Sequence, residues 1–450
     1  MENNKPDAKS LGQTRRDFLK STAAGTAGAF IGSYTLMQGQ AGAQNQEKPA
    51  DQTVTEKKPK TFPADCREKV RLAIIGPGGM GSAHVRSFIH LANKKIDNVE
   101  ITALCDVATP RLDDALKWVK EHQGTDAERY TDYRKLLESK DVDAVLIATP
   151  EHWHARQSMD ALDAGKDVYV EKPLTLRIGE ALRLYKFAKD RKERLLIGTQ
   201  YMTYPKFADA KRLIADDAIG HPTLSQTSYC RNSKVGEWLY YGIDERIKPG
   251  ETIDWAAWCG PLGVVPWNPE IYHRWRRYRR YSTGIIGDLL VHKMTPIMMA
   301  VDAGWPIRVT ATGGHYVDHA MENHDQVNIT AQFEKQHTMI VAGSTCNEYG
   351  LEEIIRGHKA NLFTSGNQLV LRPERLFAEE VEEERFQYEG MDPHDAIRQD
   401  FLKCVRTRKQ PISPVEHATK VMVIVDLATR SMWEGKAYSF CPKTMTVRSI

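Results

Sequence analysis

The 450-residue sequence lacks an excess of charge of either sign, because 62 lysine and arginine residues are matched by 59 aspartate and glutamate residues. This balance gives no indication of a nucleic-acid partner, since nucleic acids bind strongly basic surfaces. The sequence also lacks the cysteine spacing of a metal site, since its seven cysteines include no Cys-x-x-Cys pair. We therefore expect no metal site, and spacing alone assigns no disulfide.

The apolar stretch near the N-terminus is too short and too rich in glycine to span a membrane. It follows the pair Arg15-Arg16 and precedes Ala41-Gly42-Ala43, an order typical of a twin-arginine leader with its cleavage site. We expect residues 1–43 to be a signal peptide read by the twin-arginine export machinery, and the protein to be periplasmic or otherwise exported. Residues 44–69, rich in Lys, Glu, Gln and Pro, are expected to be a flexible linker.

An apolar run over residues 70–75 leads directly into a glycine-rich loop. The loop reads Gly76-Pro77-Gly78-Gly79-Met80-Gly81, which fits the pattern G-x-G-x-x-G before an expected helix. Gly76 suits the tight turn, Gly78 the close approach of backbone to a pyrophosphate, and Gly81 the packing of helix on strand. The amide groups of the loop and the positive end of the helix dipole would face the phosphates.

A second apolar strand over residues 99–105 ends on Asp106. A carboxylate there accepts hydrogen bonds from ribose hydroxyls and repels a 2′-phosphate, which predicts NAD as the cofactor rather than NADP. The alternative is that Asp106 only caps a turn before Pro110.

Apolar strands and helices alternate from residue 70 to residue 200, which predicts a Rossmann domain with a parallel sheet covered on both faces. Its later strands are expected at 142–149, 166–170 and 195–198, and its helices at 154–164 and 178–191.

Beyond residue 200 apolar residues recur with period two, which predicts a second, α+β domain over residues 201–450 with an open, mostly antiparallel sheet. Strands are expected at 223–229, 307–312, 327–333 and 338–342, a hairpin at 361–371, and helices at 395–407 and 415–433. The fold class is therefore α/β followed by α+β. We expect the second domain to bind substrate and to form a homo-oligomer through its open sheet.

Glu171-Lys172-Pro173 follows the strand that ends at residue 170. Ligands of open parallel sheets bind beyond the carboxyl ends of the strands, so Glu171 and Lys172 should border the cofactor. The lysine could hold a substrate hydroxyl and stabilise a developing oxyanion, while the proline pins the turn and is a candidate for a cis peptide bond. The alternative is a surface lysine in an ordinary turn.

Four motifs occur in an order and spacing that resemble the glucose–fructose oxidoreductase / inositol dehydrogenase (Gfo/Idh/MocA) family. They are the Gly76–Gly81 loop, Ala148-Thr149-Pro150-Glu151-His152-Trp153-His154, Tyr169-Val170-Glu171-Lys172-Pro173-Leu174 and Gly284-Ile285-Ile286-Gly287-Asp288-Leu289-Leu290-Val291-His292. The resemblance extends from Val70 to the C-terminus. It implies a Rossmann domain paired with a sheet-based substrate domain, and oxidation of a sugar or polyol hydroxyl.

The resemblance also assigns roles to residues. It implies that Lys172 contacts the reacting hydroxyl and that Asp288 and His292 form the family's catalytic Asp-x-x-x-His pair. Residues four apart share one helix face, and histidine is a natural general base near neutral pH. Without the resemblance, Asp288 and His292 would be taken for a helix cap and a core histidine.

The resemblance places Thr149 and Pro150 beside the nicotinamide ribose, with His154 or His152 facing the cofactor or starting the next helix. Gln200 or Tyr201, at the end of the last Rossmann strand, should lie near the site. Two positions depart from the family: Leu290 stands where glycine is common, and Thr295 where an acid is common. The substrate therefore cannot be transferred from any one member.

The segment 238–281 is rich in aromatic residues and contains the basic cluster Arg274–Arg280. Flat rings beside arginines suit stacking on sugar faces, but such a segment can equally pack its own aromatics or form a subunit interface. The basic cluster is interpreted as a solvated loop or a sugar-facing surface rather than an RNA site.

The sequence as a whole favours an exported, NAD-dependent oxidoreductase acting on a carbohydrate hydroxyl. His292 would take the hydroxyl proton, Asp288 would orient the imidazole, and Lys172 would polarise the oxygen. One alternative is a redox-neutral glycosidase or lyase acting through a transient keto-sugar, because an exported enzyme meets no soluble NAD pool. The other is a carbohydrate-binding protein that keeps NAD only for stability.

Overall fold

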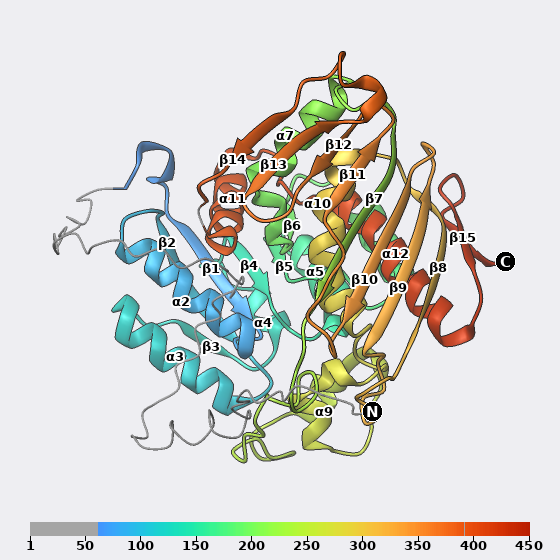
Figure 1. Cartoon of the computed structure of the whole chain (residues 1–450). Helices are drawn as coiled ribbons and strands as arrows, with labels where there is room; N and C mark the ends of the chain where they lie inside the picture. The colour runs from blue at the N-terminus through green and yellow to red at the C-terminus, as the bar shows by residue number, and fades with distance from the viewer. Residues whose placement is uncertain (1–61, 391) are drawn as a thin grey trace, which may run out of the picture. The chain divides into compact units, whose positions relative to one another are not determined.

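The computed structural model describes residues 62–390 and 392–450, so the expected leader and most of the expected linker lie outside the described residues. Six parallel strands form the first sheet in the order β3-β2-β1-β4-β5-β6 (Figure 1). They are β1 (Val70–Ile75), β2 (Val99–Cys105), β3 (Glu128–Tyr130), β4 (Ala144–Ile147), β5 (Asp167–Val170) and β6 (Leu195–Ile197). This order is that of a dinucleotide-binding Rossmann sheet, which confirms the predicted fold class.

Both faces of this sheet are covered, as near-continuous apolar strands require. In β1, Leu72 and Ile74 pack with residues of α2 and α3, whereas Ala73 and Ile75 belong to the core on the opposite face. The helices of this half are α2 (Gly79–Asn93), α3 (Thr109–Gln123), α4 (Tyr133–Leu137), α5 (Glu151–Asp163) and α6 (Ile178–Ala188). Helix α5 begins three residues earlier than predicted because Pro150 forms its N-cap and leaves Glu151 in the first turn.

The second sheet has ten strands in the order β14-β13-β12-β11-β7-β10-β9-β8-β15-β16. Neighbouring strands in this sheet are antiparallel except for the β7–β10 pair, which confirms the predicted mostly antiparallel sheet. The predicted hairpin at 361–371 is formed by β12 and β13, with Phe363 opposite Val370. The strands are β7 (Pro222–Cys230), β8 (Pro306–Gly314), β9 (Gln326–Phe333), β10 (Thr338–Ser344), β11 (Ile354–Gly357), β12 (Ala360–Phe363), β13 (Gln368–Pro373), β14 (Glu384–Gln387), β15 (Tyr438–Cys441) and β16 (Thr446–Ser449).

Helices cover one face of the second sheet, and β9 accordingly alternates buried apolar with exposed polar residues. They are α7 (Pro205–Ala215), α10 (Val291–Val301) and α12 (Val415–Glu434). Helix α11 (Pro393–Thr407) behaves differently, because its Ile397, Phe401 and Leu402 pack in the core of the Rossmann sheet beside Leu72 (Figure 1). A late helix therefore closes one face of the first domain.

The long segment between β7 and α10 contains only short helices, α8 (Trp255–Cys259) and α9 (Pro269–His273). It forms a separate aromatic core in which Trp255 and Trp258 stack with ring centroids 4.6 Å apart. The alternative that this segment packs its own aromatics is thus the one that the structure supports. The remaining short elements are 3₁₀ turns at Ala64–Cys66, Gln200–Thr203, Gly260–Leu262, Trp275–Arg277 and Arg375–Phe377, and a π-helical turn at Ile286–Leu290.

All seven cysteines lie within the described residues and are free thiols. Among residues 62–390 and 392–450, no helix combines the length and the apolar character needed to cross a bilayer.

Candidate active site

The glycine-rich loop has the geometry that a pyrophosphate requires. Helix α2 begins at Gly79 with Gly78 as N-cap and no side chain capping its first amides. A Cβ at Gly78 or Gly79 would meet no atom within 4 Å, so open space lies above these amides. Gly76, with φ of +84°, turns against β4, where a Cβ would come within 2.9 Å of the Thr149 amide nitrogen. Gly81 is closed, because a Cβ there would overlap the Gly76 carbonyl oxygen. The loop and the first turn of α2, which contains Met80, therefore fit a dinucleotide.

Asp106 follows β2 at the same edge of the sheet, where the Gly76 amide donates to the Cys105 carbonyl. Its Oδ1 accepts a hydrogen bond from the Ala108 amide at 2.9 Å, so the turn-capping interaction is present. Burial raises the pKa of Asp106 to about 6, and the Ala108 hydrogen bond opposes that rise. The turn cap uses Oδ1, and the position of Asp106 beside the glycine loop suits its predicted part in NAD binding.

His154 connects two loops at this edge. Its Nδ1 lies 2.8 Å from the Pro173 carbonyl oxygen and its Nε2 lies 2.8 Å from the Thr149 carbonyl oxygen. The Thr149 hydroxyl donates to Gln157 at 2.7 Å, which fixes the Thr149-Pro150 turn as well. His154 thus connects the backbone of the Thr149-Pro150 turn to that of the Glu171-Lys172-Pro173 loop, both of which are predicted to border the cofactor. His152 is directed elsewhere, with its Nε2 2.8 Å from the Trp258 carbonyl oxygen.

Lys172 meets Asp288 across 116 residues of sequence. Its Nζ donates to Asp288 Oδ1 at 2.9 Å and to the Asp288 carbonyl oxygen at 2.7 Å. Arg276 Nε donates to the same Oδ1 at 2.8 Å, so one carboxylate binds two cations. Burial alone would raise the pKa of Asp288, but Lys172 and Arg276 hold that pKa far below its ordinary value. Asp288 is therefore ionised at any pH at which the protein would work.

Asp288 lies in the π-helical turn that immediately precedes α10. The turn can come this close to the Glu171-Lys172-Pro173 loop because Gly287 has no side chain. A Cβ at Gly287 would overlap the Thr283 hydroxyl and would lie 3.3 Å from Pro173 Cγ. The Lys172–Pro173 peptide bond is cis, which agrees with the candidate cis bond inferred from the sequence.

His292 lies in the first turn of α10, and it is buried. Its Nδ1 has no hydrogen-bond partner among the described residues, and its ring lies 5.4 Å from that of Tyr201. Burial and the nearby Lys172 charge lower the pKa of His292 well below 6.5, so the imidazole is neutral. Asp288 hydrogen bonds to Lys172 and Arg276, and no hydrogen bond joins it to His292 among the described residues. The predicted orientation of the imidazole by Asp288 is therefore not seen as a direct contact.

Glu171 belongs to a buried chain of hydrogen bonds. His84 of α2 donates from Nε2 to Glu171 Oε1 at 2.8 Å, and Arg398 of α11 donates from Nε to His84 Nδ1 at 3.0 Å. Since Nδ1 accepts from the arginine, the neutral ring carries its proton on Nε2. Burial would raise the pKa of Glu171, but the hydrogen bond from His84 and the Lys172 charge hold it at about 2. Gln200 lies beside this chain, with its Nε2 3.3 Å from Nε2 of His394.

Sequence reasoning missed four residues that surround the site: Glu151, Arg276, His84 and Arg398. Arg276 stood in a cluster interpreted as a solvated or sugar-facing loop. The structure corrects the solvated interpretation, because Arg276 binds Asp288 and Arg277 is buried in a two-pronged pair with Asp318 at 2.7 and 2.9 Å. Glu151 lies inside the quoted Thr149–His154 motif, so its position could have suggested it. Nothing local in the sequence indicated His84 or Arg398.

Comparison with known proteins bears on both halves of the chain. Residues 70–199 match the NAD-binding Rossmann fold of an oxidoreductase family, and residues 263–440 match the C-terminal alpha/beta domain of the same family. The chain thus carries an NAD-binding domain.

Similar sequences include a glycosyl hydrolase family 109 protein of Shewanella sp. (strain ANA-3), 32% identical over 174 residues. An alpha-N-acetylgalactosaminidase of Shewanella oneidensis is 33% identical over 174 residues. Each match covers 38% of this chain and 36% of the relative, so the chain aligns with only about a third of the length of each curated relative.

Solved structures with the same fold cover more of the chain. Levoglucosan dehydrogenase in complex with NADH has a TM-score of 0.63 and 17% identity, covering 82% of this chain and 98% of that one. An oxidoreductase from Thermotoga maritima has a TM-score of 0.61 and 20% identity, covering 81% and 97%. At these identities the likeness establishes the fold alone.

Proposed function

The chain carries both domains of the Gfo/Idh/MocA oxidoreductase family, and from this premise we propose that it transfers a hydride between a sugar or glycoside hydroxyl carbon and a tightly bound NAD. The observation that carries the proposal is the Lys172–Asp288 contact at the carboxyl edge of the Rossmann sheet. It joins a cation and a carboxylate, and the Lys172 charge also acts on His292, whose pKa is lowered well below 6.5 by burial and by that charge. The neighbouring fold of levoglucosan dehydrogenase, solved with NADH, supports a sugar substrate.

The residues suit an alcohol oxidation. Lys172 is held by two oxygens of Asp288, which fixes its ammonium group where it can polarise a hydroxyl and stabilise the developing alkoxide. His292 is neutral and buried, and its Nδ1 has no hydrogen-bond partner among the described residues, so it can accept the hydroxyl proton. Bound NAD would supply the hydride acceptor, held by the Gly76–Gly81 loop, Asp106 and the Thr149-Pro150 turn. The arrangement thus separates proton acceptance from charge stabilisation.

Substitution of the two groups tests the proposal. Lys172→Met and His292→Asn should each lower sugar-dependent cofactor reduction by about 100-fold or more, since positioned acid–base groups contribute that much. Binding of NADH, followed by fluorescence, should change little in His292→Asn, because this side chain is not among the predicted cofactor-binding residues. Unchanged sugar oxidation in either variant would reject the assigned roles.

A redox-neutral glycosidase is the second candidate, favoured by the curated relatives that are named glycosyl hydrolases. In this scheme a ring hydroxyl is oxidised to a ketone, the C–H next to the ketone becomes acidic, and the aglycone is eliminated. Water then adds to the resulting double bond, and the hydride returns to the ketone carbon. Incubation of the purified protein with aryl glycosides and no added cofactor separates the two candidates. Many aglycones released per bound NAD support the glycosidase, whereas none, with net sugar oxidation, supports the dehydrogenase.

We further propose that the protein is exported in folded form with its cofactor. The support is the order of Arg15-Arg16, apolar stretch and Ala41-Gly42-Ala43, which lies outside the described residues. Replacing both arginines by lysine should retain the protein in the cytoplasm in a cell-fractionation experiment.

We also propose a homo-oligomer formed through the open face of the ten-stranded sheet, to be checked by light scattering.

A further inference from the structure

A second carboxylate, Glu151, lies next to the Lys172–Asp288 pair and has no part in the chemistry described so far. It stands in the first turn of α5 with only 1% of its surface exposed. The Ser282 hydroxyl donates to its Oε1 at 2.6 Å, and the Thr283 amide donates to its Oε2 at 3.4 Å. The Ser282 hydroxyl also accepts from the Gly284 amide at 3.1 Å. Glu151 therefore holds Ser282 and Thr283 directly, and Gly284 through the Ser282 hydroxyl.

The gripped residues belong to the segment 276–288, which carries Arg276 at one end and Asp288 at the other. Asn323 ties the two halves of this segment together, because its Nδ2 donates to the carbonyl oxygens of Arg276 at 2.9 Å and Ser282 at 3.2 Å. Gly284 adopts φ of +61°, with Asn323 so close that a Cβ would come within 2.6 Å of it. The segment is thus a tight loop held by polar contacts.

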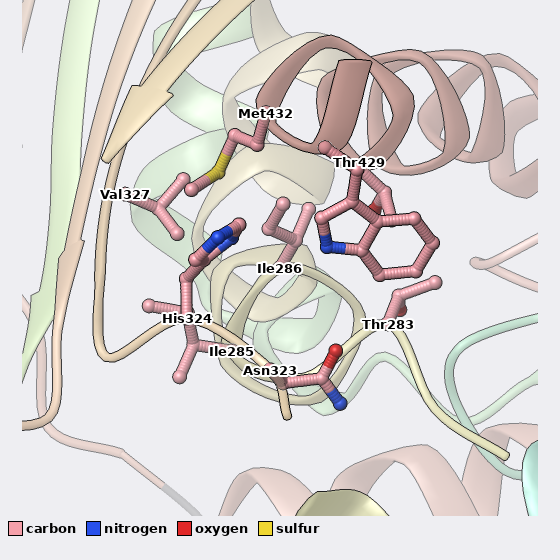
Figure 2. A pocket seen from close by; sticks show the side chains of 9 residues that line it. Thr283, Ile285, Ile286, Asn323, His324, Val327, Thr429 and Met432 are labelled. Atoms are coloured by element: carbon pink, nitrogen blue, oxygen red, sulfur yellow. The ribbon is translucent and has the colours of Figure 1, made fainter. Parts of the chain in front are cut away.

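The loop is also packed through apolar side chains, because Ile285 and Ile286 are buried in the main core, but one gap remains. Where it faces α12 it lines a small cavity, about the size that one water molecule needs. Figure 2 shows Thr283, Ile285 and Ile286 of the loop on one side of the cavity, with Thr429 and Met432 of α12 on the other. Within the described part of the chain, the Thr283 hydroxyl has no hydrogen-bond partner. Glu151 thus ties residues 282 and 283 to the Rossmann domain, while Arg177 donates to the Arg279 carbonyl oxygen at 3.1 Å and Lys172 donates to Asp288 elsewhere in the same segment.

We propose that Glu151 is a positioning residue: by holding Ser282–Gly284, its carboxyl group sets Asp288 and Arg276 against Lys172. The proposal rests on the proposed function for its catalytic consequence, but its structural part stands independently. Both oxygens of Glu151 are engaged by Ser282 and Thr283, so it acts through the loop. Burial raises its pKa to about 7, with the negative charge of Asp288 adding to the rise, which agrees with a carboxyl group kept near the ion cluster and away from water.

Two substitutions separate this role from ordinary support of the fold. Glu151→Ala removes the grip on Ser282, so kcat should fall by about 100-fold, the loss expected when catalytic groups move by about 1 Å. KM and the affinity for NAD should change little, because the glycine loop is untouched. Glu151→Gln keeps an acceptor for the Ser282 hydroxyl and should recover most of kcat.

Asp167→Asn provides a matched control. Asp167 is also a buried carboxylate that holds a loop, since its Oδ1 accepts from the Arg194 amide at 2.7 Å, but it lies at the opposite end of β5. This variant should lose thermal stability and keep kcat. Equal losses of kcat in Glu151→Ala and Asp167→Asn, or no rescue by Glu151→Gln, would overturn the proposal.

Crystal structures of the Glu151 variants provide a readout that needs no activity. In Glu151→Ala the loop should be displaced and the 2.9 Å contact between Lys172 and Asp288 lost, whereas Glu151→Gln should retain it. An unmoved loop in Glu151→Ala rejects the positioning role. If no sugar is oxidised by the unaltered protein while the loop moves in Glu151→Ala, the proposed function fails and the positioning role of Glu151 stands.

Discussion

The four glycines of the Gly76–Gly81 loop have different surroundings. A methyl group at Gly81 would overlap the Gly76 carbonyl oxygen, whereas at Gly78 or Gly79 it would enter open space. The open space at Gly78 is where the pyrophosphate is expected. A side chain at Gly81 would therefore clash with the protein itself, whereas a side chain at Gly78 would clash only with the bound cofactor.

Three alanine substitutions test this distinction. Gly81→Ala should destabilise the folded protein by about 1–3 kcal/mol, the range for forced overpacking. Gly78→Ala should keep the melting temperature and weaken NAD binding. Gly79→Ala should keep the melting temperature, because its φ is not positive, and should lose less NAD affinity than Gly78→Ala, because the motif assigns the close approach of the pyrophosphate to Gly78. Calorimetric titration with NAD and thermal unfolding measure both quantities. Strong NAD binding by Gly78→Ala would contradict the placement of the pyrophosphate.

Asp288 is the residue on which the charges of the site converge, since it neutralises both Lys172 and Arg276. Asp288→Asn keeps the shape but leaves two partly buried cations side by side, which should lower kcat by about 100-fold. Unfolding should also become easier, by about 3 kcal/mol, because a buried ion pair loses one partner. Stopped-flow reduction of the cofactor and chemical denaturation provide the two measurements.

A suitable control for Asp288→Asn is Asp143→Asn. Asp143 pairs with Arg71 at 2.6 Å but immediately precedes β4, at the edge of the sheet away from the site. This variant should keep kcat. An Asp288→Asn enzyme with full activity would show that the ion pair has no part in the chemistry.

At the scale of elements, α11 joins the C-terminal part of the chain to the cofactor edge of the Rossmann domain. Arg398 reaches His84 of α2, and His84 reaches Glu171 after β5, so three elements meet in one hydrogen-bonded chain. Arg406, about two turns later on α11, pairs with Asp97 at 2.6 Å and touches none of these groups. The same helix therefore offers a test residue and its control.

We expect Arg398→Met to weaken NAD binding as well as stability, because His84 loses the donor that fixes its tautomer and Glu171 loses its fixed orientation. Arg406→Met should reduce stability by a similar amount, about 3–5 kcal/mol for a broken buried pair, and leave NAD affinity unchanged. Equal NAD affinities in the two variants would mean that α11 only covers the sheet.

The pH dependence of stability gives a separate test of the same chain. Burial lowers the pKa of His84 from 6.5 to about 4, so the unfolded chain takes up a proton before the folded protein does. The stabilisation is complete above pH 6.5 and is lost as the pH falls toward 4. Glutamine does not titrate, so His84→Gln lacks this pH-dependent stabilisation. The difference in free energy of unfolding between the unaltered protein and His84→Gln should therefore fall by about 2 kcal/mol as the pH is lowered from 6.5 to 4.5. Denaturation curves at several pH values would measure it, and a constant difference would contradict a neutral, buried His84.

At the scale of the whole molecule, the sequence could predict what short-range patterns determine. The glycine loop, the apolar strands and the period-two runs each lie within about a dozen residues, and both sheets follow from them. Lys172, Asp288 and His292 could be placed near one another only through a resemblance. The partners Arg276 and Arg398 could not be found, because they depend on how the irregular segment 231–283 and helix α11 pack. His84 and Arg398, for example, are 314 residues apart.

The proposed reaction requires that a sugar carbon gives its hydride to NAD held in this site. It is tested most directly by mixing the NAD-loaded protein with sugars and aryl glycosides that carry deuterium on their ring carbons, and analysing the bound cofactor by mass spectrometry. We predict deuterium in the cofactor of the unaltered protein, and far less in Lys172→Met. Conversion of a deuterated substrate with no deuterium ever reaching the cofactor would contradict the account.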